Sequence, residues 1–504
     1  MRIRNTIRNS SYSIVSACVS VVLTFALRKV FLDVLPVELL GYEGLFGSLF
    51  SILSLANLGI QSLILYRLFP AFAKKDRIMI GHLMSIYRVL YRYIGIAILF
   101  IGICLIPFLK IIVSDEVINW TYVYIIYSIS LLGTLCTYFI SYKRILFQVS
   151  QEEFECTKID IVIGVICNLV KIFILLTTKS YILYLSCGLI GTVLGNIIIL
   201  KKVKHKFSDI QFTEKITWQD IRSLKMISEV KNNFVQQICF VIYGGTDNIL
   251  ITILFGIGKT GLLANYSLIQ SHITGFLTKL LNPFQMSIGN YIYSSDVDEG
   301  EKLFRMFDFI SYGVACIVSI CYIVLFNPTI SFFFGKEYLL PFSFVVGFAV
   351  NQYISWNHQF LTYYRQSFGK YELDTVPIVI AAILNILISV FLGKAIGITG
   401  VIIGTAIGHL GIWIGRVKVV YHEYMHEKVS KYVYRQIIRL GCYIIQNILA
   451  YSICKNMPLT IWGLIERLVI CILLSIAVNY LAFYRTQEIR MVCRYLKKTI
   501  AEIF

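Results

Sequence analysis

The chain has 504 residues, of which 57% are hydrophobic and only 15% are charged, and its formal net charge is +18. A water-soluble protein of this length needs far more polar surface, which excludes a soluble globular protein. Apolar stretches long enough to cross ~30 Å of hydrocarbon recur along the sequence, and they are continuously apolar, which excludes a β-barrel. We therefore predict an all-α, polytopic membrane protein.

About fourteen membrane-spanning helices are predicted. The first follows a basic N-terminus that resembles a signal peptide, but the apolar run is too long and lacks a convincing cleavage site, so we expect it to stay in the protein. In chain order the predicted spans are 10–32, 39–66, 86–109, 119–140, 158–178, 181–200, 232–256, 260–292, 303–327, 339–364, 374–394, 397–418, 435–454 and 460–483.

The basic residues are distributed unevenly between the two sides that these spans define. Of the 46 lysines and arginines, 35 lie in the termini and the even-numbered connections, and only eight lie in the opposite connections. Cytoplasmic loops are enriched in Lys and Arg, so both termini are predicted in the cytoplasm. The same distribution accounts for the net charge without a nucleic-acid partner.

Weak internal repetition predicts two similar halves. The segments "HLMSIYRVLYRYIGI" (82–96) and "EKLFRMFDFISYGVA" (301–315) occupy equivalent places, as do "GTVLGN" (191–196) and "GTAIGH" (404–409). Parallel repeats are a common transporter plan. The predicted organisation is an N-terminal lobe (1–200), a cytoplasmic linker (201–231), a C-terminal lobe (232–419), and a final helical pair with a cytoplasmic tail (420–504).

Polar residues recur every three or four positions in the leading spans of both halves, and each set lies on one helix face. Hydrocarbon offers such groups no hydrogen bonds, and a charge near mid-bilayer costs ~2.5–3.5 kcal/mol, so these faces are candidates for a hydrated cavity. Packing between helices is the alternative for every one of them. The predicted cavity residues are Arg28, Asn57, Gln61, Gln236, Asn265, His272, Lys279, Asn351 and His358, and the predicted ion-coupling residues or charge partners are Asp247 and Glu43.

A second polar face is predicted in the span 158–178. Lys171 lies three turns from Asp160 on one side of this helix, with Asn168 between them. Eleven residues correspond to ~16 Å along the axis, too far for a direct ion pair. A structural or snorkelling lysine is the simpler interpretation.

Enzyme chemistry is poorly supported, and we predict a transporter. The sequence has no Gly-rich phosphate loop, no GxSxG and no HExxH motif. The thirteen cysteines lie mostly in apolar segments without metal-ligand spacing, so no metal site or resident cofactor is expected.

The quoted segments "NTIRNSSYSIVSACVSVVLTFALRKVF", "LLGYEGLFGSLFSILSLANLG", "GGTDNILITILFG" with "GLLANYSLI", and "YILYLSCGLIGTVLGNIII" resemble the polysaccharide transporter family. Its members are flippases for lipid-linked oligosaccharides of O-antigen, lipopolysaccharide, capsule and exopolysaccharide synthesis. They belong to the superfamily of multidrug extruders and peptidoglycan-precursor flippases. The resemblance implies a V-shaped pair of six-helix lobes in the bacterial cytoplasmic (plasma) membrane, alternating access, and a glycan on undecaprenyl pyrophosphate as substrate. A polysaccharide polymerase, glycosyltransferases and membrane lipids are the implied partners.

The resemblance also bears on single residues. Arg28 matches an arginine common at the end of the family's first span, although Leu27 replaces the usual serine, and Asp247 matches a Thr-Asp-Asn signature whose role it does not define. Cationic groups such as Arg28, Lys279 and His272 suit a diphosphate. Amides such as Asn57, Gln61, Gln236, Asn265 and Asn351 suit sugars, and Asp247 or Glu43 suits H⁺ or Na⁺.

Three alternatives stay open at this stage. A small-molecule or drug cation antiporter of the same superfamily would share the lobes but favour a drier, acidic cavity. A membrane polysaccharide polymerase or glycosyltransferase would require a larger external loop. A peptidoglycan-precursor flippase would need a more cationic cavity than these spans provide.

Overall fold

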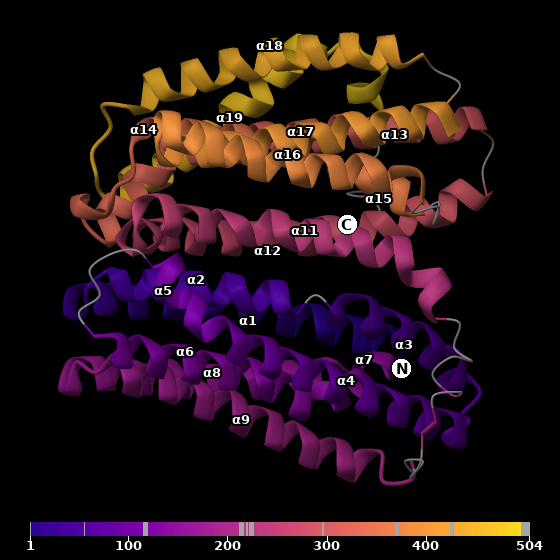
Figure 1. Ribbon diagram of the computed structural model, residues 1–504. Helices are drawn as coiled ribbons and strands as arrows, with labels where there is room; N and C mark the ends of the chain where they lie inside the picture. Colours follow the sequence, from indigo (N-terminus) through magenta and orange to yellow (C-terminus); the bar gives the residue numbers. More distant parts are fainter. Residues whose placement is uncertain are drawn as a thin grey trace. The chain divides into compact units, whose positions relative to one another are not determined.

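The computed structural model describes residues 2–54, 56–113, 119–210, 216–217, 220, 226–294, 297–367, 372–423, 425 and 428–494. Every regular element in these ranges is an α-helix or a 3-10 helix, and no strand occurs in them (Figure 1). The chain divides into two compact units, Met1–Ala264 and Asn265–Phe504. Each unit is described by itself.

The first unit is built from long helices joined by short connections. α1 packs on α8, α8 on α9, α6 on α9 and α4, and α4 on α3. Side chains cap several helices. The backbone N–H of Met79 donates to the carboxylate of Asp76 (3.0 Å), and the backbone N–H of Thr121 donates to the side-chain oxygen of Asn119 (2.9 Å). The helices are α1 (Arg2–Val34), α2 (Glu38–Leu53), α3 (Ala56–Ala73), α4 (Arg77–Leu105), η1 (Ile106–Phe108), α5 (Leu109–Ile112), α6 (Trp120–Ile140), η2 (Ser141–Arg144), α7 (Ile145–Val149), α8 (Phe154–Thr178), α9 (Tyr181–Lys206) and α11 (Met226–Phe255).

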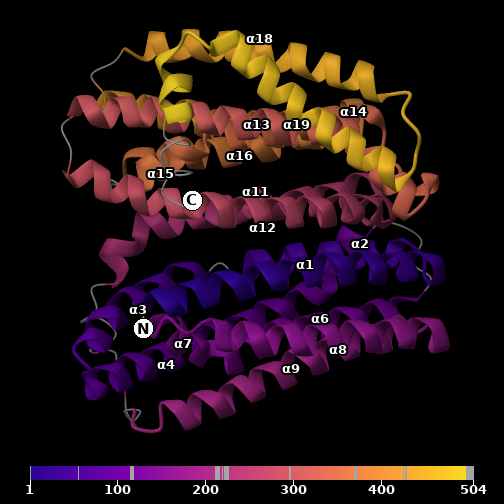
Figure 2. The ribbon, with the colours of Figure 1, turned by 180° about the vertical axis from the view of Figure 1, so that it is seen from behind.

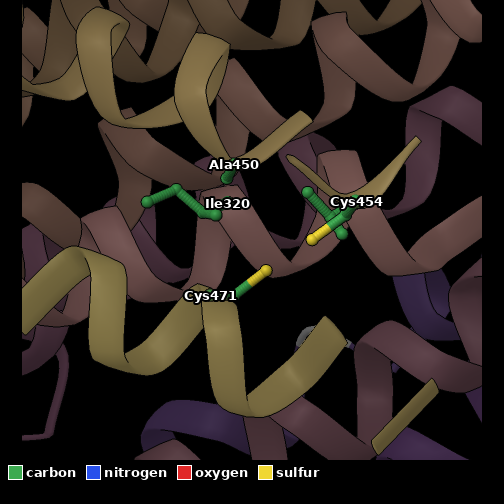
Figure 3. Packing of buried hydrophobic residues seen from close by; sticks show 5 residues of the cluster. Ile320, Ala450, Cys454 and Cys471 are labelled. Atoms are coloured by element: carbon green, nitrogen blue, oxygen red, sulfur yellow. The ribbon is translucent and has the colours of Figure 1, made fainter. Parts of the chain in front are cut away.

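The second unit contains most of α12, which begins in the first unit, and all later helices (Figure 2). α13 packs on α14, α18 and α19, and a cluster that includes Ile320, Ala450, Cys454 and Cys471 fills the space between α13, α18 and α19 (Figure 3). The helices are α12 (Ile257–Ser294), α13 (Val297–Phe333), η3 (Lys336–Tyr338), α14 (Phe342–Asn357), α15 (Gln359–Ser367), α16 (Glu372–Ile396), α17 (Ile398–Glu423), α18 (Val429–Cys454) and α19 (Ile461–Phe483).

Within the described residues, eleven helices are long and apolar enough to cross a membrane. They correspond to eleven of the fourteen predicted spans and confirm a polytopic all-α membrane protein. The prediction 39–66 is two helices, because α2 ends at Leu53 with Ser54 as its C-cap and α3 begins at Ala56. The prediction 339–364 is also two helices, because α14 ends at Asn357 and α15 begins at Gln359. The prediction 260–292 lies within the long, polar α12 of 38 residues.

The packing of α11 explains where the first unit ends. The side-chain amide of Asn248 donates to the hydroxyl of Ser48 (2.9 Å) and the carbonyl of Gly44 (3.4 Å) on α2. A Cβ at Gly41 would lie 2.2 Å from the carbonyl oxygen of Ile257, so the backbones approach closely there. α11 and the start of α12 therefore pack with the first unit. The predicted division into two lobes at 201–231 stays a prediction.

Candidate functional site

Two polar hollows lie inside the first unit, and both are lined by Arg144 and Asp160. The tyrosine hollow has a volume of about 240 Å³, and its lining includes Gln61, Tyr87, Tyr91, Tyr138, Tyr142 and Gln148. The α8–α9 groove has a volume of about 300 Å³, and its lining includes Asn168, Lys171, Gly188, Gly191, Thr192 and Asn196. Hydrophilic space among membrane-spanning helices is where a polar solute finds partners that hydrocarbon lacks.

Arg144 lies at the boundary between the two hollows. It ends η2, the 3-10 turn that follows α6 directly, and this turn places its guanidinium beside α8 and α9. Its two terminal nitrogens donate to the two carboxylate oxygens of Asp160 (3.0 and 2.7 Å), and its Nε donates to the side-chain oxygen of Asn196 (3.0 Å). This bidentate geometry is the strong form of an arginine–carboxylate pair.

The tyrosine hollow combines aromatic faces with hydroxyl and amide groups. The Tyr87 hydroxyl donates to that of Tyr91 (2.6 Å), and the Tyr138 hydroxyl donates to the carbonyl of Ser54, where α2 ends (3.3 Å). The rings of Tyr91 and Tyr138 lie 5.6 Å apart. Gln61, a predicted cavity residue, lines this hollow with them. A lining of aromatic faces and a few polar groups is typical of ligand pockets.

The α8–α9 groove brings together the three polar residues whose spacing predicts a common face on α8. Asp160, Asn168 and Lys171 all line it. The ammonium of Lys171 lies 4.5 Å from the ring centroid of Tyr184 on α9, a cation–π contact. A Cβ at Gly188 would lie 3.1 Å from the same nitrogen, so the glycine makes room for the lysine.

Arg28 and Glu43 lie near the same pair of tyrosines on α9. Both charges act electrostatically on Tyr181 and Tyr184. Phe31, one turn from Arg28, packs edge-on against both rings at 5.8 and 5.4 Å. Arg28 is half-buried and Glu43 is exposed. The structure therefore brings these two predicted residues, from α1 and α2, to one region of the first unit.

The other predicted residues of the first unit lie on α3 and α11. Asp247 is half-buried and acts electrostatically on the buried Tyr243 one turn away, and Gln236 is buried. The neighbouring Asn248 holds α11 to α2, so part of the Thr-Asp-Asn segment serves helix packing. The side chain of Asn57 lies outside the described residues.

The predicted residues of the second unit lie mostly in helix contacts. The side-chain oxygen of Asn351 lies 2.7 Å from Nδ1 of His409, and Nδ1 of His358 lies 2.6 Å from the carbonyl oxygen of Ile354. The His358 ring also stacks on Trp413. Asn265 is buried, His272 is half-buried and Lys279 is exposed, all on α12. Their role at a substrate cavity stays a prediction.

The second unit also buries charged residues, and its buried arginines Arg365, Arg416 and Arg439 are among the basic residues counted in the predicted cytoplasmic connections. Asp374 accepts from Arg365 (2.5 Å) and from Nε of Arg416 (3.4 Å), and all three side chains are at most 3% exposed. A second buried pair joins Arg439 to Asp308. Periodicity alone missed these residues because each lies near the end of a predicted span. The signal available was an acidic residue, Asp374, at the start of an apolar run.

The described residues hold no group of three or more His, Cys, Asp or Glu side chains placed to hold a metal ion. The two hollows of the first unit are lined by cations, carboxylates, amides, hydroxyls and aromatic rings.

No family model matches the chain, and no curated protein matches it. Solved structures do. An inward-facing multidrug resistance MATE family transporter of the MOP superfamily is 14% identical with a TM-score of 0.63, over 84% of this chain and 100% of that one. The lipid II flippase MurJ in an inward closed conformation is 12% identical with a TM-score of 0.66, over 94% and 98%. A mutant of the Vibrio cholerae MATE transporter VcmN is 13% identical with a TM-score of 0.54, over 84% and 98%.

Sequence identities of 12–14% establish similarity of fold alone. The chain is an all-helical, multi-pass membrane protein with the fold that MATE transporters of the MOP superfamily and the lipid II flippase MurJ share.

Proposed function

We propose that this chain is a flippase that moves an undecaprenyl-pyrophosphate-linked oligosaccharide from the cytoplasmic to the outer leaflet of the plasma membrane. The observation that carries the proposal is the polar interior of the first unit, where two hollows keep arginine, lysine, amide and tyrosine groups among apolar helices. A glycan and a diphosphate need such groups, because neither can enter hydrocarbon unaided.

Residues of both kinds are available for the two parts of this substrate. Arg28, half-buried beside Tyr181 and Tyr184, is the proposed diphosphate contact. Gln61, in a hollow lined by tyrosines, is a proposed sugar contact. Asp247, half-buried on α11, is the proposed site of coupling to H⁺ or Na⁺, and the substrate would cross by alternating access.

The extent of the structural matches supports a flippase. The match to the lipid II flippase extends over 94% of this chain, whereas those to the two MATE transporters named above each extend over 84%. The second candidate is a drug cation antiporter, because the MATE transporters share the fold at similar TM-scores. Polymerases and glycosyltransferases of the same pathway are proposed as partners, not as activities of this chain.

Reconstitution distinguishes the two candidates. The purified chain is placed in proteoliposomes with a fluorescent lipid-linked oligosaccharide, and the label exposed to an external quencher is followed over time. We expect the exposed fraction to change faster than in empty liposomes. A chain that moves ethidium against a proton or sodium gradient but leaves the glycolipid in place would be an antiporter.

The neighbours Arg28 and Lys29 supply a matched pair of variants. Lys29 is exposed and forms an ion pair with Asp33 one turn away (2.8 Å). Arg28→Ala is expected to reduce glycolipid movement at least tenfold, as for the loss of a charge-assisted hydrogen bond, whereas Lys29→Ala is expected to leave it unchanged. Equal rates in both variants would remove Arg28 from the mechanism.

Asp247→Asn tests ion coupling in the same assay. We expect a lower rate or a loss of its dependence on pH or sodium, because the amide is isosteric but cannot carry the charge. Asp33→Asn is the control, since Asp33 is exposed in α1. An unchanged rate at every pH and sodium concentration would assign Asp247 to packing.

A further inference from the structure

The α8–α9 groove contains a lysine that no acidic residue neutralises among the described residues. Lys171 lies within α8, whose apolar character qualifies it as a membrane span, and the contact described for its ammonium is the Tyr184 ring. Asp160 lines the same groove but lies eleven residues away, ~16 Å along the helix. A charged side chain within a membrane span usually faces a polar partner or a bound solute, so a lysine without an acidic partner points to a ligand of opposite charge.

The other cation of the groove is already occupied. Arg144 uses both terminal nitrogens on Asp160 and its Nε on Asn196. This ion pair on the groove lining is internally neutral. Lys171 is therefore the positive charge available to a bound anion, with Asn168 and Thr192 as neighbouring hydrogen-bonding groups on the same lining.

Glycines shape the space around the lysine. A Cβ at Gly191 would lie 2.2 Å from the sulfur of Cys167, and one at Gly188 would lie 3.1 Å from the ammonium of Lys171. The resulting volume of about 300 Å³ is at the lower limit of ligand pockets, ~300–1,000 Å³. It suits a phosphate or diphosphate and is too small for a headgroup of several sugars.

The groove lies between two apolar helices. α8 and α9 both qualify as membrane spans by length and composition. The exposed apolar residues Val162, Ile166 and Phe173 of α8 lie on the opposite side of the helix from Lys171, and only the exposed Val170 borders the groove lining. α9 runs along the edge of the first unit in both views (Figures 1 and 2). Because a bare anion does not enter hydrocarbon, an anion that reaches this groove within the membrane carries an apolar tail.

We propose that the α8–α9 groove binds a phosphate-bearing lipid, whose phosphate pairs with Lys171. The juxtaposition of a half-buried lysine and a glycine-lined hollow between two apolar spans carries this inference. It does not depend on the proposed flippase activity. The lipid is either an anionic phospholipid of the membrane or a polyprenyl diphosphate carrier.

Native mass spectrometry of the full chain in detergent tests the proposal. The probes are phosphatidylglycerol, undecaprenyl diphosphate, a galactolipid without phosphate, and inorganic diphosphate. We expect Lys171→Met to weaken binding of both phosphate lipids at least tenfold, because a charge-assisted contact is lost, and Lys171→Arg to stay within threefold of the unchanged chain. Lys394→Ala, at an exposed lysine near the end of α16, is the control and should bind normally.

A groove-filling variant keeps the proposal testable if Lys171→Met does not fold. Thr192→Trp leaves the charge in place but occupies the groove, and it should also weaken binding. Tighter binding of undecaprenyl diphosphate than of phosphatidylglycerol would identify the carrier as the ligand, and equal binding would identify bulk anionic lipid; both results support a lipid-phosphate site. Unchanged binding in Lys171→Met, or equal binding of the galactolipid, overturns it. Tight binding of inorganic diphosphate alone, with no gain from the lipid tail, overturns the lipid assignment.

The failure of this proposal is separable from failure of the proposed function. If the chain moves the lipid-linked oligosaccharide but binds phosphate lipids equally well without Lys171, the lipid site in the groove is refuted and the flippase function stands. If binding of phosphate lipids requires Lys171 but the chain moves no glycolipid, the flippase function is refuted and the lipid site in the groove stands.

Discussion

The carboxylate of Asp374 is the group whose removal should most disturb the second unit. It is 1% exposed and accepts from two arginines, Arg365 at 2.5 Å and Arg416 at 3.4 Å. Arg416 also donates to the hydroxyl of Thr362 (2.6 Å), so the cluster ties the start of α16 to α15 and α17. The substitution Asp374→Asn preserves the shape of the side chain but removes the charge that both guanidinium groups share.

The expected cost follows from burial. Removing one member of a buried ion pair costs about 3–5 kcal/mol, because the remaining charge loses its partner without regaining water. This figure is the cost of breaking the cluster, not the net worth of the pair. In a unit of 240 residues, about 3 kcal/mol lowers the melting temperature by roughly 6–12 °C.

The assay is thermal unfolding of the purified chain in detergent, followed by tryptophan fluorescence. Glu372→Gln is the matched control, since Glu372 lies two residues earlier in the same helical turn and is exposed. We expect the control to melt within 2 °C of the unchanged chain. If Asp374→Asn lowers the melting temperature no more than the control does, the inference that water is excluded from this cluster and that both arginines depend on the Asp374 carboxylate would be refuted.

Three further results are expected. Asp160→Arg should impair glycolipid movement because it breaks the ion pair with Arg144. Adding Arg144→Asp should restore part of the rate, because the ion pair is then re-formed with the charges exchanged. No recovery in the double variant would argue against a role for this pair. Gly404→Ala should lower the melting temperature, since its Cβ would lie 2.3 Å from the hydroxyl oxygen of Ser389. Gly441→Ala is the control and should not lower it, because a Cβ there meets no atom within 4 Å. Equal melting temperatures for the two variants would contradict the close approach at Gly404. Thr217→Cys should react with a charged maleimide from the cytoplasmic side alone, and labelling from outside would invert the predicted topology.

The apolar helices of this protein could be predicted from the sequence because hydrocarbon imposes a strict local rule. Each span needs about 20 apolar residues with all backbone groups bonded within the helix, so length and hydropathy suffice to locate it. The polar face of α8 could be predicted for a similar reason, since Asp160, Asn168 and Lys171 share a face at a period of 3.6 residues. Both are properties of one helix at a time.

The interruptions of helices depended on contacts with other helices. The sequence 39–66 has the apolar length of one span, yet α2 ends at Leu53. The carbonyl of its C-cap residue, Ser54, accepts from the Tyr138 hydroxyl of α6. The sequence 339–364 divides at His358, whose ring stacks on Trp413 of α17. A freed backbone group inside a membrane needs a partner from elsewhere in the protein, and hydropathy does not identify that partner.

The partners of the charged residues were decided only by the tertiary structure. By sequence, Arg144 is one more basic residue of a cytoplasmic connection, and Arg416 is another. In the folded chain the first is bound to Asp160 and Asn196 between two hollows, and the second is buried on Asp374. Hydropathy and spacing report where a charge lies along one helix, whereas a salt bridge requires two helices to bring their side chains within a few ångströms, and that distance is a property of the packed fold.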